Sequence, residues 1–444
     1  MSYARVLLCF VALGCDAAGT YDVGTWIALR EIESPRAGWR FGSSIANAGD
    51  LDGDGRDDLL IVDEFSRPGR PGAGEDESRA YFHSSRTGEL LVVLKASPGV
   101  NSLMHAHGAG SLGDVDGDGR PEFWVSNMDP SRPCPWRGER CIVGRITVCD
   151  GQTREPLFEL QGSEEDNECF GDSAAPCGDV DGDGVADILV GAPCQWNSYR
   201  RGRYVRIFSG KDGHTIAEVS RHRGPFTSFG RCVGGLDDVD GDGVSDFFVA
   251  DPLHAPGESE LLVYCGRRRT VLATIRMSMG TPHASTRRFG MNAVVIGDVD
   301  GDGSVDVALG DGERRIWIAS PRCGEVVRSI EAPLGFVAIG RVVSRCGDVD
   351  GDGIDDIAFS AQHIAARASS VLVHSGRTGE LLRELRGTRP LGQFGWTLCP
   401  LGDIDDDGRP ELAISEPDCA PFEERGVRLP PMRERRGVVW VISL

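Results

Sequence analysis

An acidic stretch of nine residues, Asp50-Leu-Asp-Gly-Asp-Gly-Arg-Asp-Asp58, recurs six more times and constrains the fold more than any other feature of the chain. Every copy has Asp at positions 1, 3 and 5, Gly at position 6, Asp or Glu at position 9, and an apolar run after it. The later copies start at Asp114, Asp179, Asp238, Asp298, Asp348 and Asp403. Self-similarity at intervals of 50 to 65 residues predicts one repeat architecture, although 444 residues could hold two or three domains.

Each repeat carries the signals of four short strands. Nine residues before the loop, most repeats have Phe-Gly, as at Phe41-Gly42, while the second has His105-Ala106 and the sixth Ile339-Gly340. An apolar strand follows the loop, and two more strands flank a turn such as Ser209-Gly-Lys-Asp-Gly213. Four strands in 50 to 65 residues are typical of a propeller blade. The predicted fold class is all-β, a seven-bladed β-propeller of four-stranded antiparallel blades.

The seventh repeat lacks a fourth strand, because the chain stops after its third, Val438–Ser443. The segment Thr25–Ile32, which precedes the first repeat, resembles the fourth strands of the other repeats. We therefore expect residues near 24–32 to complete the last blade and close the ring, which removes exposed sheet edges.

The carboxylates of the loop suit a hard cation. Asp at positions 1, 3 and 5 gathers three carboxylates, a backbone carbonyl near position 7 and the acid at position 9 can complete the shell, and Gly at position 6 permits a sharp turn. Oxygen ligands in a flexible loop favour Ca²⁺ over transition metals. Seven divalent ions would add 14 positive charges to a formal net charge of −21, leaving −7. The acidity also argues against nucleic acid as a partner.

The predicted ligands are the residues at positions 1, 3, 5 and 9 of each loop, for up to seven Ca²⁺ ions. They are Asp50, Asp52, Asp54 and Asp58; Asp114, Asp116, Asp118 and Glu122; Asp179, Asp181, Asp183 and Asp187; Asp238, Asp240, Asp242 and Asp246; Asp298, Asp300, Asp302 and Asp306; Asp348, Asp350, Asp352 and Asp356; and Asp403, Asp405, Asp407 and Glu411.

An EF-hand shares the start of this motif but is excluded by position 12. An EF-hand has Glu there and helices on both sides. Here position 12 is always apolar, as in Ile61 and Val190, and lies in a strand-like run. A plain polar turn explains one such loop but not seven with the same ligand set.

The Phe-Gly pair, the acidic loop and an apolar strand ending in Gly191-Ala192-Pro193 together resemble the FG-GAP repeat. That repeat builds the N-terminal propeller of integrin α-subunits and occurs in many bacterial exported proteins. The resemblance covers about residues 24–444 and implies a seven-bladed propeller with Ca²⁺ in its hairpin loops. It also implies a role in adhesion or protein interaction, although a fold alone does not determine function. This chain departs from integrins in having acidic loops in all seven repeats.

The first residues resemble an export signal. Arg5 precedes the apolar run Val6–Leu13, which is too short to span a bilayer. Ala12-Leu13-Gly14-Cys15 resembles a lipoprotein cleavage box with Cys15 as the lipidated residue, and an ordinary cleaved signal is the alternative. We expect a signal at residues 1–18, a propeller domain at 24–444, and an extracellular or cell-surface location, with a lipid anchor at Cys15 as one form of it.

Twelve of the 14 cysteines lie beyond this segment. An even number of cysteines in an exported chain makes disulfides the default expectation. Cys134 and Cys141 flank a short loop and are the simplest pair to envisage, but the pairing stays open.

The connectors between second and third strands must lie on the face opposite the acidic loops, because strands alternate in direction. They are irregular and rich in arginine, with scattered aromatic residues. We expect a protein or glycan ligand to bind there, and a solvated face with internal Arg–Glu pairs is the alternative. The candidate contact residues are Trp136, Arg137, Trp196, Tyr199, Arg200 and Arg201.

Catalytic motifs are missing from the sequence. It has no Gly-x-Ser-x-Gly and no phosphate-binding glycine loop, and its histidines are scattered. Binding is therefore the favoured function class and an enzyme is not expected. The alternative is a calcium-dependent polysaccharide hydrolase or lyase, which would need acid, Arg or His residues clustered near the central channel.

Overall fold

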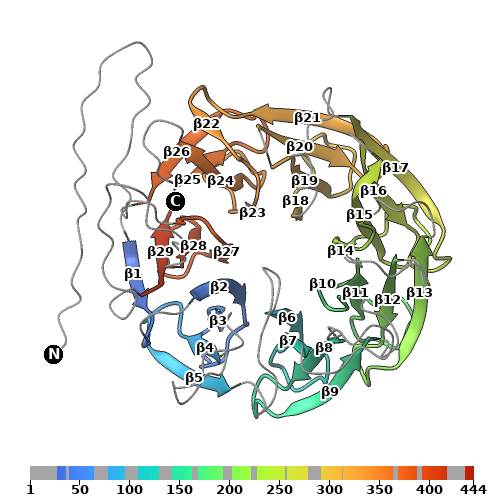
Figure 1. Ribbon diagram of the computed structural model, residues 1–444, viewed down its shortest axis with the longest axis horizontal. Helices are drawn as coiled ribbons and strands as arrows, with labels where there is room; N and C mark the ends of the chain where they lie inside the picture. Colours follow the sequence, from blue (N-terminus) through green and yellow to red (C-terminus); the bar gives the residue numbers. More distant parts are fainter. Residues whose placement is uncertain are drawn as a thin grey trace, which may run out of the picture.

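The computed structural model describes residues 28–36, 40–64, 79–95, 109–129, 143–162, 169–193, 203–221, 228–255, 258–278, 292–312, 314–363, 369–387, 393–417 and 436–444. In these ranges the chain forms seven antiparallel sheets arranged as a ring around an open centre (Figure 1). The predicted seven-bladed β-propeller is therefore confirmed.

Blades 1 to 4 each contain four strands paired in chain order. Blade 1 holds β2 (Arg40–Asn47), β3 (Leu59–Glu64), β4 (Arg79–His83) and β5 (Leu90–Lys95). Blade 2 holds β6 (Ala109–Gly113), β7 (Glu122–Asp129), β8 (Val143–Cys149) and β9 (Pro156–Gln161). Blade 3 holds β10 (Ser173–Pro176), β11 (Ile188–Ala192), β12 (Arg203–Phe208) and β13 (Thr215–Arg221). Blade 4 holds β14 (Cys232–Leu236), β15 (Asp246–Ala255), β16 (Glu258–Tyr264) and β17 (Val271–Ser278).

Blades 5 to 7 repeat this plan with two variations. Blade 5 holds β18 (Ala293–Ile296), β19 (Asp306–Gly310), β20 (Arg315–Ser320) and β21 (Glu325–Glu331). In blade 6 the innermost strand is split into β22 (Phe336–Val337) and β23 (Val343–Arg345), followed by β24 (Ile357–His363), β25 (Ser369–His374) and β26 (Leu381–Arg386). Blade 7 holds β27 (Leu398–Gly402), β28 (Glu411–Glu416), β29 (Val438–Ser443) and, from the other end of the chain, β1 (Ala28–Glu33).

The N-terminal strand closes the ring, as the sequence predicts. β1 pairs with β29 in antiparallel register, with Ile32 opposite Val439 and Glu33 opposite Val438 (Figure 1). Ile32 is buried beside Phe41 and Ile45 of blade 1. Residues from the two ends of the chain thus share one core cluster.

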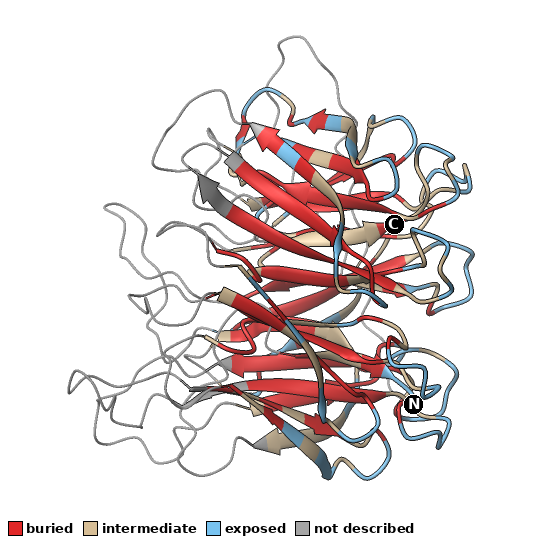
Figure 2. Cartoon of the chain, turned by 90° about the vertical axis from the view of Figure 1, so that its right-hand side faces the viewer, coloured by how far each residue is buried: buried red, intermediate tan, exposed pale blue. Residues whose placement is uncertain are grey.

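The hydrophobic core consists of clusters that lie between neighbouring blades. One cluster joins Leu189 and Ile207 of blade 3 to Phe229 and Phe247 of blade 4, for example. Second strands such as β11, β19 and β28 are buried along their whole length and form part of the largely red interior in Figure 2, whereas outer strands such as β13 and β21 are partly exposed. Each blade therefore gains most of its apolar burial from its neighbours.

The Phe-Gly pair is a contact between blades. Phe41 is fully buried, and Gly42 has a φ of 83°, a conformation that favours glycine. A Cβ atom on Gly42 would lie 2.9 Å from the Cβ of Ser415 in blade 7, so the site also excludes a side chain. Ile339 and Gly340 occupy the equivalent place in blade 6, where Ile339 is fully buried. His105-Ala106 of the second repeat lies outside the described residues.

Several cysteines have a different role from the one expected. Cys177 and Cys346 are free thiols buried within the clusters between blades, where they pack as small apolar side chains. Cys149, Cys232, Cys265, Cys323 and Cys399 are also free. The disulfide expectation is therefore not met at these seven positions, and the suggested pair, Cys134 and Cys141, lies outside the described residues.

Candidate metal centres and central channel

Each acidic loop folds around the carboxylate at its first position. In blade 1 the Gly53 amide donates to Asp50 Oδ1 at 2.6 Å and the Gly55 amide donates to Asp50 Oδ2 at 2.9 Å. The loops of blades 2 to 6 form the same two bonds. The glycine at position 4 has positive φ in those loops, and in blade 7 Asp406 takes that position at a φ of 65°.

The acid at position 9 is buried beneath its loop. Asp58 is fully buried, and its Oδ2 accepts the amide of Leu51 at 2.8 Å. All seven loops form the equivalent bond from the residue at position 2. This carboxylate thus links the start of the loop to the start of the second strand.

The second oxygen of the position-9 acid faces the turn between the third and fourth strands, named here the outer turn. The outer turns comprise residues 84–88, 150–154, 209–213, 265–269, 320–324 and 375–379 of blades 1 to 6. A turn amide donates to this oxygen in five blades, for example Gly266 to Asp246 Oδ1 at 2.9 Å. Loop and outer turn therefore lie on the same face of the ring, where Figure 2 shows exposed loops.

Burial raises the pKa of every position-9 acid. Loss of solvation raises the pKa of Asp58, Asp306 and Glu411 to about 7 each, and that of Asp187 and Asp356 to about 6. Neighbouring loop carboxylates raise these values further, while backbone amides lower them. Without a counter-cation, the ionised form of each loop is therefore disfavoured.

The predicted ligands converge, and outer-turn residues join them. Sets of side chains whose ligand atoms all lie within 4.8 Å of one another include Asp50, Asp52 and Asp54; Asp114, Asp116 and Glu122; Asp116, Asp118 and Asp150; Asp240, Asp242 and Cys265; and Asp300, Asp302 and Cys323. Asp150, Cys265 and Cys323 were not among the predicted ligands. They were missed because they lie in the turn between the third and fourth strands, and only strand pairing brings that turn to the loop.

Basic residues of the outer turns neutralise some loops. Arg377 Nε donates to Asp352 Oδ2 at 2.9 Å, and the same guanidinium donates to the Asp352 carbonyl at 2.9 Å. In blade 4 two arginines approach the loop: Arg267 lies 3.6 Å from Asp242 Oδ1 and Arg268 contacts Asp240. The loops therefore have a similar backbone conformation but differ in the charged residues around them.

The donor set fits a divalent cation. Two or three carboxylates approach one another in each of these sets, and a divalent cation would offset their mutual repulsion. The buried Asp306 Oδ1 has no hydrogen-bond partner among the described residues, so its lone pairs are open to a cation. The apolar position 12 lies in a strand, for example Ile61 in β3 and Val190 in β11, which confirms that these are not EF-hands.

The residues proposed to contact a ligand are not covered by the structure. Trp136, Arg137, Trp196, Tyr199, Arg200 and Arg201 all lie outside the described residues. Near that face, arginines of the fourth strands β13 and β17 pair with an acid of the third strand β16: Arg276 Nε lies 2.9 Å from Glu260 Oε1, and Arg221 Nη1 lies 2.7 Å from Glu260 Oε2. Within the described part of that face, paired charges thus fit the solvated alternative.

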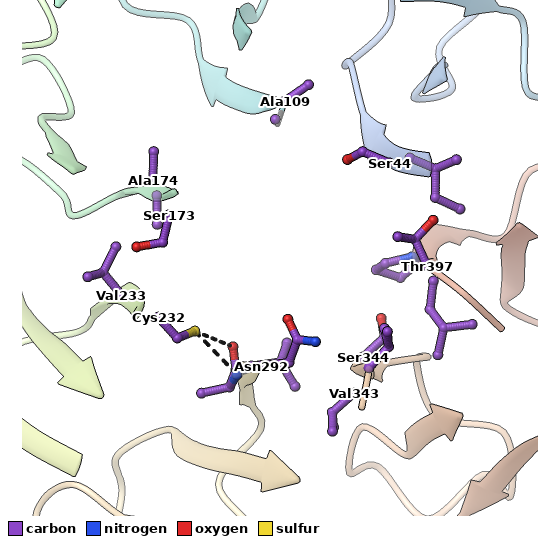
Figure 3. Close-up of a pocket in the computed structure, with 18 of the residues that line it drawn as sticks. Ser44, Ala109, Ser173, Ala174, Cys232, Val233, Asn292, Val343, Ser344 and Thr397 are labelled. Carbon is purple, nitrogen blue, oxygen red and sulfur yellow. Dashed lines mark hydrogen bonds between the residues drawn. The ribbon is translucent and has the colours of Figure 1, made fainter. Parts of the chain in front are cut away.

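The central channel is lined by small neutral residues. A cavity of about 360 Å³ lies among the innermost strands, with Ser44, Ser173, Cys232, Ser344 and Thr397 on its wall (Figure 3). Cys232 Sγ accepts the Ala293 amide at 3.3 Å. Among the described lining residues Arg345 alone is charged. The cluster of acids and bases that the hydrolase or lyase hypothesis requires is therefore not supported by this part of the channel.

Comparison with known proteins agrees with the ring and its motif. A model of the FG-GAP repeat matches residues 41–75. Integrin alpha-4 of Xenopus laevis is 33% identical over 176 residues, which cover 38% of this chain and 17% of that protein. Integrin alpha-PS2 of Drosophila melanogaster is 28% identical over 251 residues, which cover 52% of this chain and 17% of that protein. The chain therefore spans less than a fifth of the length of these relatives.

A solved structure shares the fold at low sequence identity. The crystal structure of BBS1N in complex with ARL6DN, soaked with lead, aligns with a TM-score of 0.50 and 10% identity, covering 94% of this chain and 97% of that one. This likeness concerns the fold alone. Within the described residues, the structure contains no helix of the length and apolarity needed to cross a bilayer.

Proposed function

We propose, from the premise that this chain is a seven-bladed FG-GAP β-propeller similar to that of integrin α-subunits, that it is an exported binding module stabilised by Ca²⁺. The likeness to integrin alpha proteins supports an adhesion or interaction role. The observation that carries the calcium part is the set of seven loops, each with a buried position-9 acid whose pKa is raised by burial.

Ca²⁺ suits these loops because their ligands are predominantly hard oxygens. In each loop the acids at positions 1, 3, 5 and 9 would hold the ion. The bound ion would compensate the charge that the loop concentrates at one face of the ring. Calcium would then act as a structural component of each hairpin, and ligand specificity would lie elsewhere.

The ligand-binding surface is proposed to be the face opposite the acidic loops, with a protein or a glycan as ligand. Export to the cell exterior, with or without a lipid on Cys15, is consistent with such a ligand. The binding test is an array of glycans and extracellular proteins probed with the calcium-loaded chain and again with chelator. Calcium-dependent capture of a defined ligand is expected. Absence of capture from both sets would contradict the interaction role.

Calcium dependence is tested by thermal unfolding. Chelation should lower the Tm sharply, and Ca²⁺ should restore it, because a ligand that binds only the native state stabilises it by mass action. Asp52→Asn should reduce the number of bound Ca²⁺ ions by one, since an amide oxygen keeps the geometry but removes the charge. Asp57→Asn is the matched control, because Asp57 lies at position 8 and accepts a hydrogen bond from Asn47. An unchanged Tm after addition of the chelator would refute the calcium proposal.

A further inference from the structure

We propose that the acidic loop of blade 5 binds a thiophilic divalent cation of the Zn²⁺ or Cd²⁺ class, with Cys323 as one of its ligands. The inference rests on the proposed function, because it takes the acidic loops to be cation sites. It goes further because it gives one loop a sulfur ligand, and therefore a different cation preference from the other acidic loops.

Cys323 lies where a cation bound by the loop would meet it. The outer turn of blade 5 folds against the loop, and Cys323 Sγ lies 3.4 Å from Asp302 Oδ2. The ligand atoms of Asp300, Asp302 and Cys323 are all within 4.8 Å of one another. Ser320 Oγ donates to the same Asp302 oxygen at 2.8 Å and orients that carboxylate toward the turn.

A buried oxygen in this blade lacks the partner that its equivalents in blades 1 to 4 and 6 have. Asp306 is fully buried, and its Oδ2 accepts the Val299 amide at 2.8 Å. In five other blades the second oxygen accepts an outer-turn amide, but here that turn position is Pro321, which has no N–H. Asp306 Oδ1, the oxygen equivalent to those that accept a turn amide in the other five blades, therefore has no hydrogen-bond partner among the described residues. An unpaired buried acceptor is costly, and a cation would satisfy it.

In other blades a basic side chain lies beside the position-5 carboxylate. Arg377 in blade 6 pairs with the position-5 carboxylate, and Lys211 in blade 3 lies 3.9 Å from its equivalent. Among the described residues no Arg or Lys forms an ion pair with the blade 5 acids, and Asp302 is contacted by a hydroxyl and a thiol. Arg322 of the same outer turn reaches the loop at Ser304 Oγ, to which it donates at 3.3 Å, without forming an ion pair with a loop carboxylate among the described residues. The blade 5 acids are thus less compensated than those of blades 4 and 6, and the turn adds a soft donor.

Blade 4 provides the internal comparison. Cys265 Sγ also lies close to a loop carboxylate, 3.3 Å from Asp242 Oδ2. There, however, Arg267 and Arg268 already neutralise the acids, and Gly266 donates to the buried Asp246 oxygen. Less uncompensated charge therefore lies beside Cys265, so its thiol should not take part in binding a thiophilic cation.

The ligand chemistry favours a borderline or soft metal. A thiolate binds Zn²⁺ and Cd²⁺ far better than Ca²⁺, whereas carboxylates accept all three. On binding, the Cys323 S–H bond breaks, its electron pair forms the sulfur–metal bond, and the proton passes to solvent. No electron transfer is involved, so the site needs no oxidant or reductant.

The experiment adds Cd²⁺ to calcium-saturated protein and follows the thiolate-to-cadmium charge-transfer absorption in the ultraviolet. The wild type should show a saturable band with one Cd²⁺ per chain. Cys323→Ser should lose that band, whereas Cys265→Ser should keep it. Because Cys323 is exposed, the serine variant should fold, and its calcium-dependent Tm should match that of the wild type. As a second measurement on the unmodified protein, Cd²⁺ should slow alkylation of Cys323, as read by peptide mass spectrometry.

A band that persists in Cys323→Ser, or unchanged alkylation of Cys323, would overturn the inference. If Cd²⁺ gives no band while Ca²⁺ raises the Tm, the inference fails but the proposed function stands. If neither cation raises the Tm, the proposed function itself fails.

Discussion

At the scale of single residues, the position-9 carboxylate connects three parts of its blade. Its two oxygens accept an amide from the loop and, in five blades, an amide from the outer turn, while the residue itself starts or directly precedes the second strand. Loss of this acid would therefore disconnect the loop and the turn together. Its burial also explains why an ionised carboxylate at this point needs either several donors or a cation.

Pro321→Ala should stabilise the cation-free protein by about 1 kcal/mol. The new N–H can donate to Asp306 Oδ1, which removes an unsatisfied buried acceptor worth about 1–3 kcal/mol. Losing proline frees the unfolded chain at a cost of about 0.4–1 kcal/mol. Blade 1 accommodates a side chain at this turn position, where Ser85 donates to Asp58 Oδ1 at 3.2 Å. Urea unfolding in the presence of chelator measures the change, and a less stable variant would contradict this view of Asp306.

The loop ligands could be predicted from the sequence, whereas the residues around them could not. The four acids lie within nine residues, and the glycines between them allow a tight turn. The spacing alone therefore predicts that the acids converge. Asp150 and Cys323 reach their loops only through strand pairing. Asp150 lies 28 residues after Glu122 and Cys323 lies 17 after Asp306, so local spacing carries no signal of these contacts.

At the scale of elements, β1 holds the ring closed with few side chains. Ile32 is its one buried residue, and Arg30 reaches across to blade 1, where its Nε donates to the Arg86 carbonyl at 2.8 Å. Without β1, the apolar strand β29 would present an unpaired edge. The closing strand was predictable because Val438–Ser443 leaves its repeat one strand short. The split inner strand of blade 6 was not, since β22 is only two residues long.

Ile32→Ala should destabilise the propeller by about 2–4 kcal/mol, because it leaves a cavity in the cluster shared by blades 7 and 1. Ile32→Val is the matched control and should cost about 0.5–1.5 kcal/mol, since it removes a single methylene. Chemical denaturation of calcium-loaded protein measures both. Equal losses of stability in the two variants would mean that β1 contributes little to ring closure. An Ile32→Ala variant as stable as the wild type would lead to the same conclusion.

At the scale of the whole molecule, charge is distributed unevenly. The acidic loops lie on one face, whereas the described channel wall is nearly neutral, with Arg345 as its charged residue. Seven acidic loops on one face, each with a buried acid at position 9, create a cost that all blades share. Cations bound on that face would lower the cost in every blade at once, which makes ion occupancy a property of the whole ring.

The cation-free protein should consequently be more stable at about pH 5 than at about pH 8. The position-9 acids have folded-state pKa values raised above their unfolded values, to about 7 for Asp58, Asp306 and Glu411. A raised carboxyl pKa gives stability that is complete below the unfolded pKa and is lost as pH rises through the folded pKa. The Tm in chelator should therefore fall between pH 5 and pH 8, and saturating Ca²⁺ should flatten the fall by holding the acids ionised. High salt serves as the control, because it screens surface repulsion but not the loss of solvation at buried groups. If high salt abolishes the pH dependence, general surface charge, and not the seven buried acids, would be its cause.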